Sequence, residues 1–476
     1  MTERSEPDSA SKSAPSLDPS HPDSPVPDPA EARPDQVDEL AERVYDVVAG
    51  EEDERSCDAI PDEACREVPG NFVLNALNGA STKLAEQLAS PGLVLPWLLG
   101  AVGAPAAFVG FLVPVRRAGS LLPQLSIAGR IRAYEHRKWF WVLAGMVQAV
   151  ALVLMIPAIL LLPPLGAGLA VLVLLAVFSL ASGLGSVAFK DVLAKTIPKG
   201  RRGRLLGVRA TVGGLLAMGA AVLLRGYVAE EGSLAPYVIL LATAAGLWVL
   251  GSLFFSAIRE QPGATDGGRN GFEEARAGLS FLREQPAFGR FVLARAFLLA
   301  AQLAAPFYAL RAQETTGVEA GNLAIFIMAS SLAAVLSSPF WGRFSDASSR
   351  RVMVAGGIWT AVTVGLALVA DVLPESSWSL ALFALVFFSS GFAVAGVRLG
   401  RKTYLVDAAP ERERPLMVAV ANTLVGIMYA VGGGLGLMAD WLGVAVVLWT
   451  LGAMAVLGTM LAWRLPEADE LVVARG

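Results

Sequence analysis

Residues 342–351 read Gly-Arg-Phe-Ser-Asp-Ala-Ser-Ser-Arg-Arg, a short stretch that is polar and basic. An apolar run of about membrane length precedes it at 322–341, and another follows it at 352–370. The glycine permits close backbone approach, the aspartate can accept hydrogen bonds at a helix end, and arginines are retained on the cytosolic side of a membrane. The stretch therefore predicts a tight cytosolic turn between two membrane helices.

The composition of the whole chain is that of a helical membrane protein with a polar N-terminal tail. Of the 476 residues, 54% are hydrophobic and 17% are charged, whereas a soluble protein carries about a quarter charged residues. A membrane-spanning helix needs about 20 apolar residues. Ten runs of this kind lie near 139–161, 166–189, 205–227, 236–258, 288–311, 321–341, 352–370, 378–397, 416–436 and 443–463.

The connections between these runs alternate between basic and non-basic. The basic connections carry Lys190, Lys195, Lys199, Arg201, Arg202 and Arg204, then Arg343, Arg350 and Arg351, then Arg398, Arg401, Lys402, Arg412 and Arg414. The others, such as 162–166 and 371–375, are short and neutral or acidic. The positive-inside rule places the basic connections and both termini in the cytosol. We therefore expect an integral protein of a bacterial-type inner (plasma) membrane, in contact with the lipid bilayer.

The two halves of the membrane part resemble each other in sequence. At an offset of 212 residues (402 − 190), Lys190, Leu193, Pro198 and Arg202 match Lys402, Leu405, Pro410 and Arg414. At an offset of 213 (342 − 129), Gly129, Arg137 and Lys138 fall on Gly342, Arg350 and Arg351. Internal repeats of this size are typical of secondary transporters, whose substrate site lies between the repeats.

The region before the first of the ten runs can be divided in two ways. Hydropathy alone selects 92–114 as one span, which leaves the arginine pair 116–117 in the cytosol. The repeat instead predicts one helix at about 75–100 and a second at about 105–128. We prefer the second division, because it gives each half six helices and keeps the basic connections in register.

At this point the chain resembles the major facilitator superfamily. The stretch that begins at Gly342 and includes Asp346, Arg350 and Arg351 matches the superfamily signature between the second and third helices of a half. The first half keeps only Gly129, Arg137 and Lys138, with alanine at the position of the aspartate. The resemblance implies an all-α polytopic membrane protein with twelve helices in two six-helix halves. It also implies that these seven residues belong to a cytosolic gate.

The resemblance and the hydropathy pattern together predict five parts of the chain. They are a cytosolic, mostly disordered tail (1–70), an N-terminal six-helix half (71–258), a cytosolic linker with a surface helix (259–287), a C-terminal six-helix half (288–465) and a cytosolic C-terminal tail (466–476).

The preferred division brings charged residues of the first two helices to similar depths in the membrane. Lys83 and Glu86 are three residues apart and share one helical face. Glu86 and Arg116 lie near the midplane, where an unpaired charge costs at least about 2.5–3.5 kcal/mol and usually marks function. One hypothesis assigns anionic-substrate binding to Arg116 and Arg117, and proton coupling to Glu86 with Lys83. The alternatives are a structural ion cluster that locks the two helices, or arginines that lie in the cytosol.

Uncharged polar residues inside the predicted spans are further candidates for substrate contacts. The candidates are Asn78, Gln302, Tyr308 and Asn422. Each is also compatible with an interhelical hydrogen bond, which is the commoner role of such residues.

The chain is therefore predicted to be a permease that moves a small organic solute by alternating access. We expect the solute to be anionic and proton-coupled, and the carrier to act as a monomer without cofactor, metal or nucleic acid. The chain carries no nucleophile–base pair, phosphate loop or metal cluster, so an enzyme is not expected. The alternative is a transporter-like membrane protein that senses or scaffolds through its tail and does not transport.

Overall fold

The computed structural model of the protein describes 66–122, 130–131, 133–226, 233–263, 281–317, 319–369, 378–409 and 414–467, together with positions 42, 43, 45, 124 and 265. Every regular element in this part of the chain is a helix. Most of the predicted cytosolic tail (1–70), most of the predicted linker (259–287) and Gly129 lie outside the described residues.

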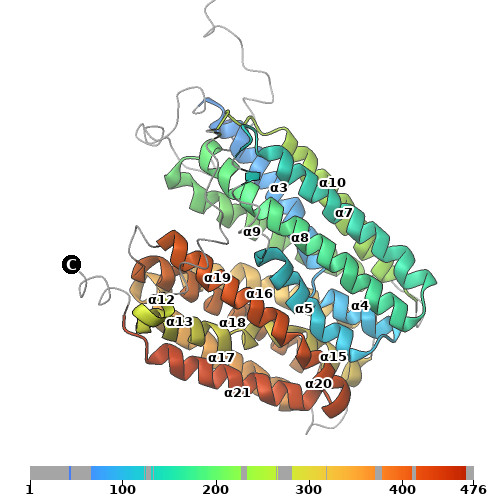
Figure 1. Ribbon diagram of the computed structural model, residues 1–476. Coiled ribbons are helices and arrows are strands. Elements are labelled where there is room, and N and C mark those ends of the chain that lie inside the picture. Colours follow the sequence, from blue (N-terminus) through green and yellow to red (C-terminus); the bar gives the residue numbers. More distant parts are fainter. Residues whose placement is uncertain are drawn as a thin grey trace, which may run out of the picture.

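The helices form two bundles that lie side by side (Figure 1). The first bundle contains α3 (Val68–Leu88), α4 (Val94–Val102), α5 (Ala106–Leu121), α7 (Lys138–Leu161), α8 (Pro164–Thr196), α9 (Lys199–Gly226) and α10 (Ala235–Ser256). The second contains α12 (Phe281–Glu284), α13 (Pro286–Phe297), α14 (Ala300–Leu303), α15 (Ala305–Thr316), α16 (Ala320–Ala347), α17 (Ser349–Val369), α18 (Trp378–Ala408), α19 (Arg414–Gly432), α20 (Gly434–Leu442) and α21 (Val444–Trp463).

Ten helical segments of the described chain are long and apolar enough to cross a membrane. The broken helix α3–α4 and the short helix α5 complete two sets of six. A turn separates α4 from α5 at Gly103, whose φ of 75° is readily adopted by glycine. Residues 92–114 are therefore not one helix, and the division indicated by the repeat is confirmed.

Several predicted helix bounds are wrong, and each for a local physical reason. α8 continues to Thr196 and α18 to Ala408, so Lys190, Arg398, Arg401 and Lys402 are helical residues and not loop residues. The predicted bounds follow the apolar runs, which end at the first charged residues. The backbone hydrogen bonds of a helix continue past such residues, so the helix is longer than its apolar run. The predicted helix at 75–100 begins earlier, at Val68, and is interrupted at 89–93.

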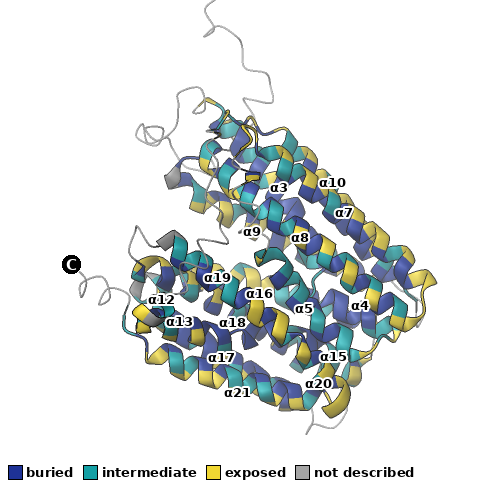
Figure 2. Ribbon diagram, viewed as in Figure 1, coloured by how far each residue is buried: buried dark blue, intermediate teal, exposed yellow. Residues whose placement is uncertain are grey.

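The outer faces of the bundles carry exposed apolar side chains, as Figure 2 shows for α7, α8 and α21. Leu161 on α7 is 80% exposed, Leu165 on α8 is 64% exposed and Trp449 on α21 is 68% exposed. Apolar surface on this scale is costly in water and favourable in hydrocarbon. The bundle surface is therefore built to face lipid.

The two bundles meet at the end where α4 turns into α5. The backbone N–H of Ala107 donates to Asp440 at 3.1 Å, and the Gln313 amide donates to the Trp97 carbonyl at 2.8 Å. Gly436 packs so closely on α5 that an added Cβ would lie 2.9 Å from the Cα of Gly110. These contacts close one end of the space between the bundles.

Candidate functional site

A cavity of about 620 Å³ lies between the two halves. Helices α3 and α5 line it from one side, and α16 and α18 line it from the other. Its size falls within the usual range for small-molecule sites. The side chains of Lys83 and Glu86 in its wall are 47% and 35% exposed, so the cavity is open to solvent although one end of the bundle is closed.

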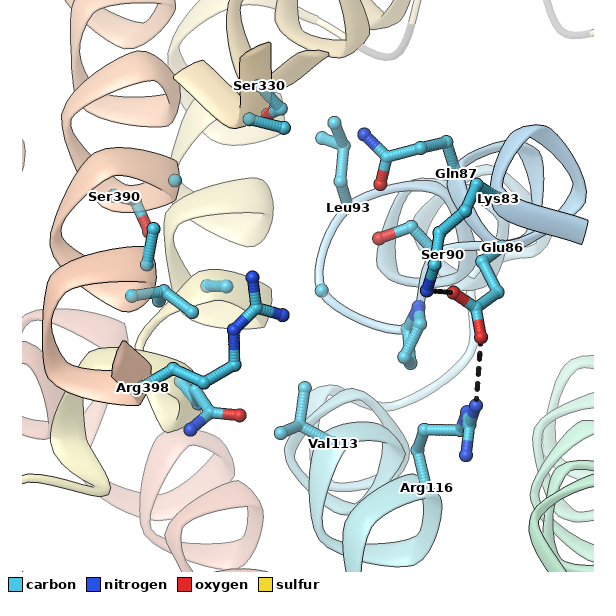
Figure 3. A pocket seen from close by; sticks show the side chains of 18 of the residues that line it. Lys83, Glu86, Gln87, Ser90, Leu93, Val113, Arg116, Ser330, Ser390 and Arg398 are labelled. Carbon is cyan, nitrogen blue, oxygen red and sulfur yellow. Dashed lines mark hydrogen bonds and ion pairs between the residues drawn. The ribbon is translucent and has the colours of Figure 1, made fainter. Parts of the chain in front are cut away.

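Among the described residues that line this cavity, Glu86 is the one carboxylate. Its Oε2 lies 2.6 Å from Lys83 Nζ, and its Oε1 lies 3.6 Å from Arg116 (Figure 3). The Arg116 guanidinium also stacks over the ring of Phe178, 5.2 Å from its centroid. Lys83, Glu86 and Arg116 thus lie together, as the alternative of an ion cluster between the two helices requires, and Arg117 lines the same cavity.

The opposite wall adds two cations that the sequence analysis placed in a cytosolic loop. Arg398 and Lys402 lie on the cavity face of α18. Figure 3 shows the Arg398 side chain extending from α18 toward the space below Leu93 and Ser90. No described carboxylate lies within ion-pair distance of either residue. The lining thus holds five cations, Lys83, Arg116, Arg117, Arg398 and Lys402, against one carboxylate.

Serine hydroxyls supply most of the neutral polar surface of the C-terminal wall. Ser330, Ser337 and Ser338 come from α16, and Ser390 comes from α18. The three serines of α16 recur at helical spacing, so they form a stripe on the inner face of that helix. A hydroxyl can donate or accept a hydrogen bond, so these serines suit a polar solute.

The first helix of each half is interrupted beside the cavity. In the first half the interruption at 89–93 lies in the cavity wall, and in the second half Gln302 and Ala305 line the cavity where α14 ends and α15 begins. Discontinuous helices expose backbone polar groups, which is tolerated in a membrane only where they face protein or a cavity.

The four uncharged residues that were predicted to contact the substrate do not all lie at the cavity. Gln302 lines the cavity, and its Oε1 is buried with no hydrogen-bond donor in the described structure. Asn78 instead donates to the Gly251 carbonyl at 2.9 Å and ties α3 to α10. Tyr308 is buried in the apolar core, and Asn422 accepts a hydrogen bond from Arg295 at 2.9 Å. Asn78, Tyr308 and Asn422 are not among the residues that line the cavity.

The signature residues Arg137 and Lys138 of the first half converge on two acids. Arg137 forms an ion pair with Asp191, and the backbone N–H groups of Arg137 and Lys138 donate to Glu260 at 3.0 and 2.8 Å. Lys195 completes the cluster, because its Nζ lies 2.8 Å from Glu260 Oε1. Glu260, whose side chain is fully buried, thus binds the start of α7 in the half that lacks the signature aspartate.

The signature residues Arg350 and Arg351 of the second half converge on Glu467. Arg350 lies 2.7 Å from this carboxylate and Arg351 lies 3.9 Å from it. A Cβ on Gly342 would meet no atom within 4 Å, so no close approach requires a glycine there. The side chain of Asp346 is outside the described structure.

Sequence reasoning missed Arg398 and Lys402, and also Glu260 and Glu467. The spacing of Ser390, Arg398 and Lys402 is a signal that could have found the first pair, since these residues share one helical face. Within the described part of the chain, no group of three or more His, Cys, Asp or Glu side chains could hold a metal ion.

Comparison with known proteins supports the architecture. Residues 297–475 match the family model of the Major Facilitator Superfamily. The uncharacterized protein Rv2209 of Mycobacterium tuberculosis is 27% identical over 361 residues, which cover 73% of this chain and 67% of that protein. The multi-drug resistance efflux pump PmrA homolog of Lactococcus lactis is 31% identical over 166 residues, 34% of this chain and 39% of that protein.

Solved transporters share the fold over most of both chains. The inward open xylose transporter XylE from E. coli has a TM-score of 0.63 at 14% identity, covering 86% of this chain and 99% of XylE. The nucleoside transporter NupG has a TM-score of 0.63 at 12% identity, covering 83% of this chain and 99% of NupG. Residues 297–475 are therefore similar to the Major Facilitator Superfamily, and both halves of the chain share the fold of these solved transporters.

Proposed function

We propose that this transporter carries a small organic anion by alternating access, and that Glu86 couples the movement to a proton. The observation that supports the proposal is the excess of five lining cations over one carboxylate. Arginine binds carboxylate and phosphate through a planar fork of donors. The positive wall therefore favours an anion over a cation, and the cavity volume suits a small solute.

The ion pairs of Glu86 suggest how a substrate and a proton could be linked. An incoming anion competes with Glu86 for Arg116 and Lys83, which are its neighbours at 3.6 and 2.6 Å. A carboxylate that loses its cations takes up a proton more readily. Binding of the anion and protonation of Glu86 would then favour each other.

The orientation follows from the basic connections between helices. We propose that both termini lie in the cytosol of a bacterium and that the closed end at Ala107 and Asp440 lies on the outer side of its inner membrane, because basic connections are retained in the cytosol. The cavity would then open to the cytosol. We propose a monomer as the working unit, because one chain lines the whole cavity.

The test is transport into liposomes that contain the purified full-length protein. Labelled mono- and dicarboxylates, phosphate esters and neutral sugars are offered with and without an imposed pH gradient. Arg116→Ala should abolish uptake of the anion that is accepted, and Glu86→Gln should retain exchange while losing the response to the gradient. Arg464→Gln, at an exposed position after α21, is the matched control and should transport like the wild type.

Two outcomes would contradict the proposal. Uptake of neutral sugars in preference to every anion would refute the anion assignment. A gradient response that survives in Glu86→Gln would refute the coupling assignment alone.

The local similarity to an efflux pump homologue favours a second candidate, export of amphipathic compounds. The same liposomes distinguish the two when lipophilic cations are added to the panel. Transport of such cations with no transport of anions would favour this candidate, although it would require them to enter a positively charged cavity.

A further inference from the structure

The side-chain amide of Gln302 lies at the central cavity without a hydrogen-bond partner. Gln302, on α14, lines the cavity and is 5% exposed. Its Oε1 is buried, and no described residue donates a hydrogen bond to it. Buried polar groups are nearly always hydrogen-bonded, and an unsatisfied one destabilises the fold. The cavity wall therefore holds an amide whose hydrogen-bonding capacity is unused.

The interrupted first helices of the two halves meet beside this amide. An added Cβ on Gly92 would lie 3.1 Å from the Cβ of Ala305, so the interruption at 89–93 touches the start of α15. Gln302 precedes Ala305 by about one helical turn, and both residues line the cavity. Gln302 is thus placed next to the contact between the halves, at the edge of the space that a solute would occupy.

Two serine hydroxyls belong to the same wall of the cavity. Ser330 comes from α16 and Ser390 from α18. An added Cβ on Gly391 would lie 3.5 Å from the Ser330 carbonyl oxygen, so the two serines are close neighbours. Neither hydroxyl has a hydrogen-bond partner among the described residues. Figure 3 shows both serines on one wall, across the cavity from Ser90 and Leu93.

The cations of the cavity lie at a different level from this uncharged polar group. On α18, Arg398 follows Ser390 by eight residues, which corresponds to about 12 Å along the helix axis. Figure 3 shows Arg398 and Arg116 on opposite walls and both away from Ser330. A solute that contacts both levels carries an anionic group at one end and hydrogen-bonding groups at the other.

A hydroxyl group suits the uncharged level better than an ammonium group. The glutamine amide has an acceptor oxygen and a donor NH₂, and its terminal torsion is broad, so either atom can face a solute. A solute hydroxyl both donates and accepts, so it can bond to the amide and to the serines. An ammonium group would instead bring a positive charge to a lining that already holds five cations against one carboxylate.

We propose that the substrate is an elongated, polyhydroxylated organic anion, such as a sugar acid or a sugar phosphate. Its anionic group binds among the cations that include Arg116 and Arg398, and its hydroxyls bind Gln302, Ser330 and Ser390. The inference rests on the proposed anion carrier and names its substrate class. Gln302 then determines specificity, because a site that hydrogen-bonds a hydroxyl discriminates against a solute that lacks it.

The experiment compares hydroxylated anions with alkyl anions of the same chain length on the purified full-length protein. Calorimetry measures the binding of gluconate against hexanoate, and of sorbitol phosphate against hexyl phosphate. The two pairs distinguish a carboxylate from a phosphate group, and sorbitol reports binding without a charge. The variants are Gln302→Met and Ser390→Ala. Gln148→Met is the matched control, because Gln148 also has a buried amide without a described partner but does not line the cavity.

In the wild type, the better of the two hydroxylated anions should bind roughly tenfold or more tightly than its alkyl counterpart. Gln302→Met should remove most of this preference and leave binding of the alkyl anion unchanged. Ser390→Ala should reduce the preference by roughly twofold or more. Gln148→Met should bind all five compounds like the wild type.

The stability of the empty protein separates a specificity role from a structural one. Methionine keeps the unbranched shape of glutamine without its polar atoms, so Gln302→Met should not lower the Tm of the empty protein. Gln313 is the structural counterpart, since it donates to the Trp97 carbonyl at 2.8 Å, and Gln313→Met should lower the Tm. A lower Tm for Gln302→Met with unchanged selectivity would assign Gln302 to the fold and overturn the inference.

Two further results would overturn it, and both differ from failure of the proposed function. Alkyl anions that bind the wild type as tightly as hydroxylated ones would leave an anion carrier without a hydroxyl site. A preference for hydroxylated anions that survives when Gln302→Met and Ser390→Ala are combined would remove these residues from the site. Sorbitol binding as tightly as gluconate and sorbitol phosphate would instead contradict the anion carrier and leave the hydroxyl site in place.

Discussion

Glu260 and Glu467 occupy equivalent positions in the two halves of the protein. Each stands four residues after the last helix of its half, since α10 ends at Ser256 and α21 at Trp463. Each binds the start of the third helix of that half, through the N–H groups of Arg137 and Lys138 or through the Arg350 side chain. A carboxylate at a helix N-terminus is favourable, because it accepts from N–H groups and complements the helix dipole.

We predict that Glu260→Gln destabilises the protein more than Glu467→Gln. The Glu260 side chain is fully buried and Lys195 is 18% exposed, whereas Glu467 and Arg350 are each 27% exposed. Removing one partner of a fully buried pair costs about 3–5 kcal/mol. We expect a somewhat smaller cost for Glu260, which for a chain of 476 residues corresponds to a fall in Tm of roughly 2–4 °C. Thermal unfolding in detergent measures this, and an equal or larger fall for Glu467→Gln would contradict the prediction.

Gly436→Leu should block closure of the end where the two halves meet. A Cβ at this position would lie 2.9 Å from the Cα of Gly110, so a larger side chain must separate α20 from α5. We expect uptake to fall by at least about tenfold, because a carrier that cannot close one end cannot complete its cycle.

The matched control for this variant is Gly434→Leu, at a position in α20 where a Cβ meets nothing within 4 Å. A single cysteine at the cavity residue Ser337, in a background without Cys57 and Cys65, reports which end is open. The Gly436 variant should allow labelling from the end that is closed in the wild type. Labelling unchanged from the wild type would refute this account.

Asp440→Ala should weaken the same closed end, but only slightly. Its carboxylate accepts one hydrogen bond from the Ala107 N–H at 3.1 Å, at an exposed position. A hydrogen bond of this kind contributes about 0.5–1.5 kcal/mol, so the equilibrium between the two open states should shift by roughly two- to tenfold. The labelling rate at Ser337→Cys measures the shift. Asp440→Asn keeps an acceptor oxygen and should show a smaller effect.

Asn75→Ala should lower the thermal stability more than Asn78→Ala. Asn75 accepts hydrogen bonds from the buried guanidinium of Arg209 through its side chain and its backbone carbonyl. Loss of an acceptor for a buried charge costs more than loss of the neutral bond from Asn78 to the Gly251 carbonyl.

The expected difference between these two variants is about 1–2 kcal/mol, or roughly 1–2 °C in Tm for a chain of 476 residues. Parallel unfolding curves in the same detergent measure it. If Asn78→Ala proved the more destabilising of the two, Arg209 would not depend on Asn75 for its charge.

Much of the architecture could be predicted from the sequence, because it depends on local patterns. The length of apolar runs gives membrane helices, and the offset of 213 between Gly129 and Gly342 divides the region before residue 139 correctly. That division placed Glu86 near Arg116, and the two side chains lie 3.6 Å apart. A repeat carries this information because equivalent helices in the two halves begin and end at equivalent positions.

The direction in which each helix face points could not be predicted in this way. Arg398 and Lys402 follow an apolar run, so they resemble the cytosolic residues that close a span. They lie instead on the cavity face of α18, because that helix continues to Ala408 and packs against α16 and α17. Asn78 shows the reverse. Its side chain donates to the Gly251 carbonyl of α10, and it is not among the residues that line the cavity.

The sequence by itself therefore determined the helices, their repeat and the similar depth of Glu86 and Arg116, since these depend on hydropathy and spacing along one chain. Only the tertiary structure decided which cations face the cavity and which acids bind the signature residues. Helix rotation and the position of Glu260 depend on packing between segments more than a hundred residues apart, as in the bond from Lys138 to Glu260. Such contacts leave no periodic signal in the sequence of either segment.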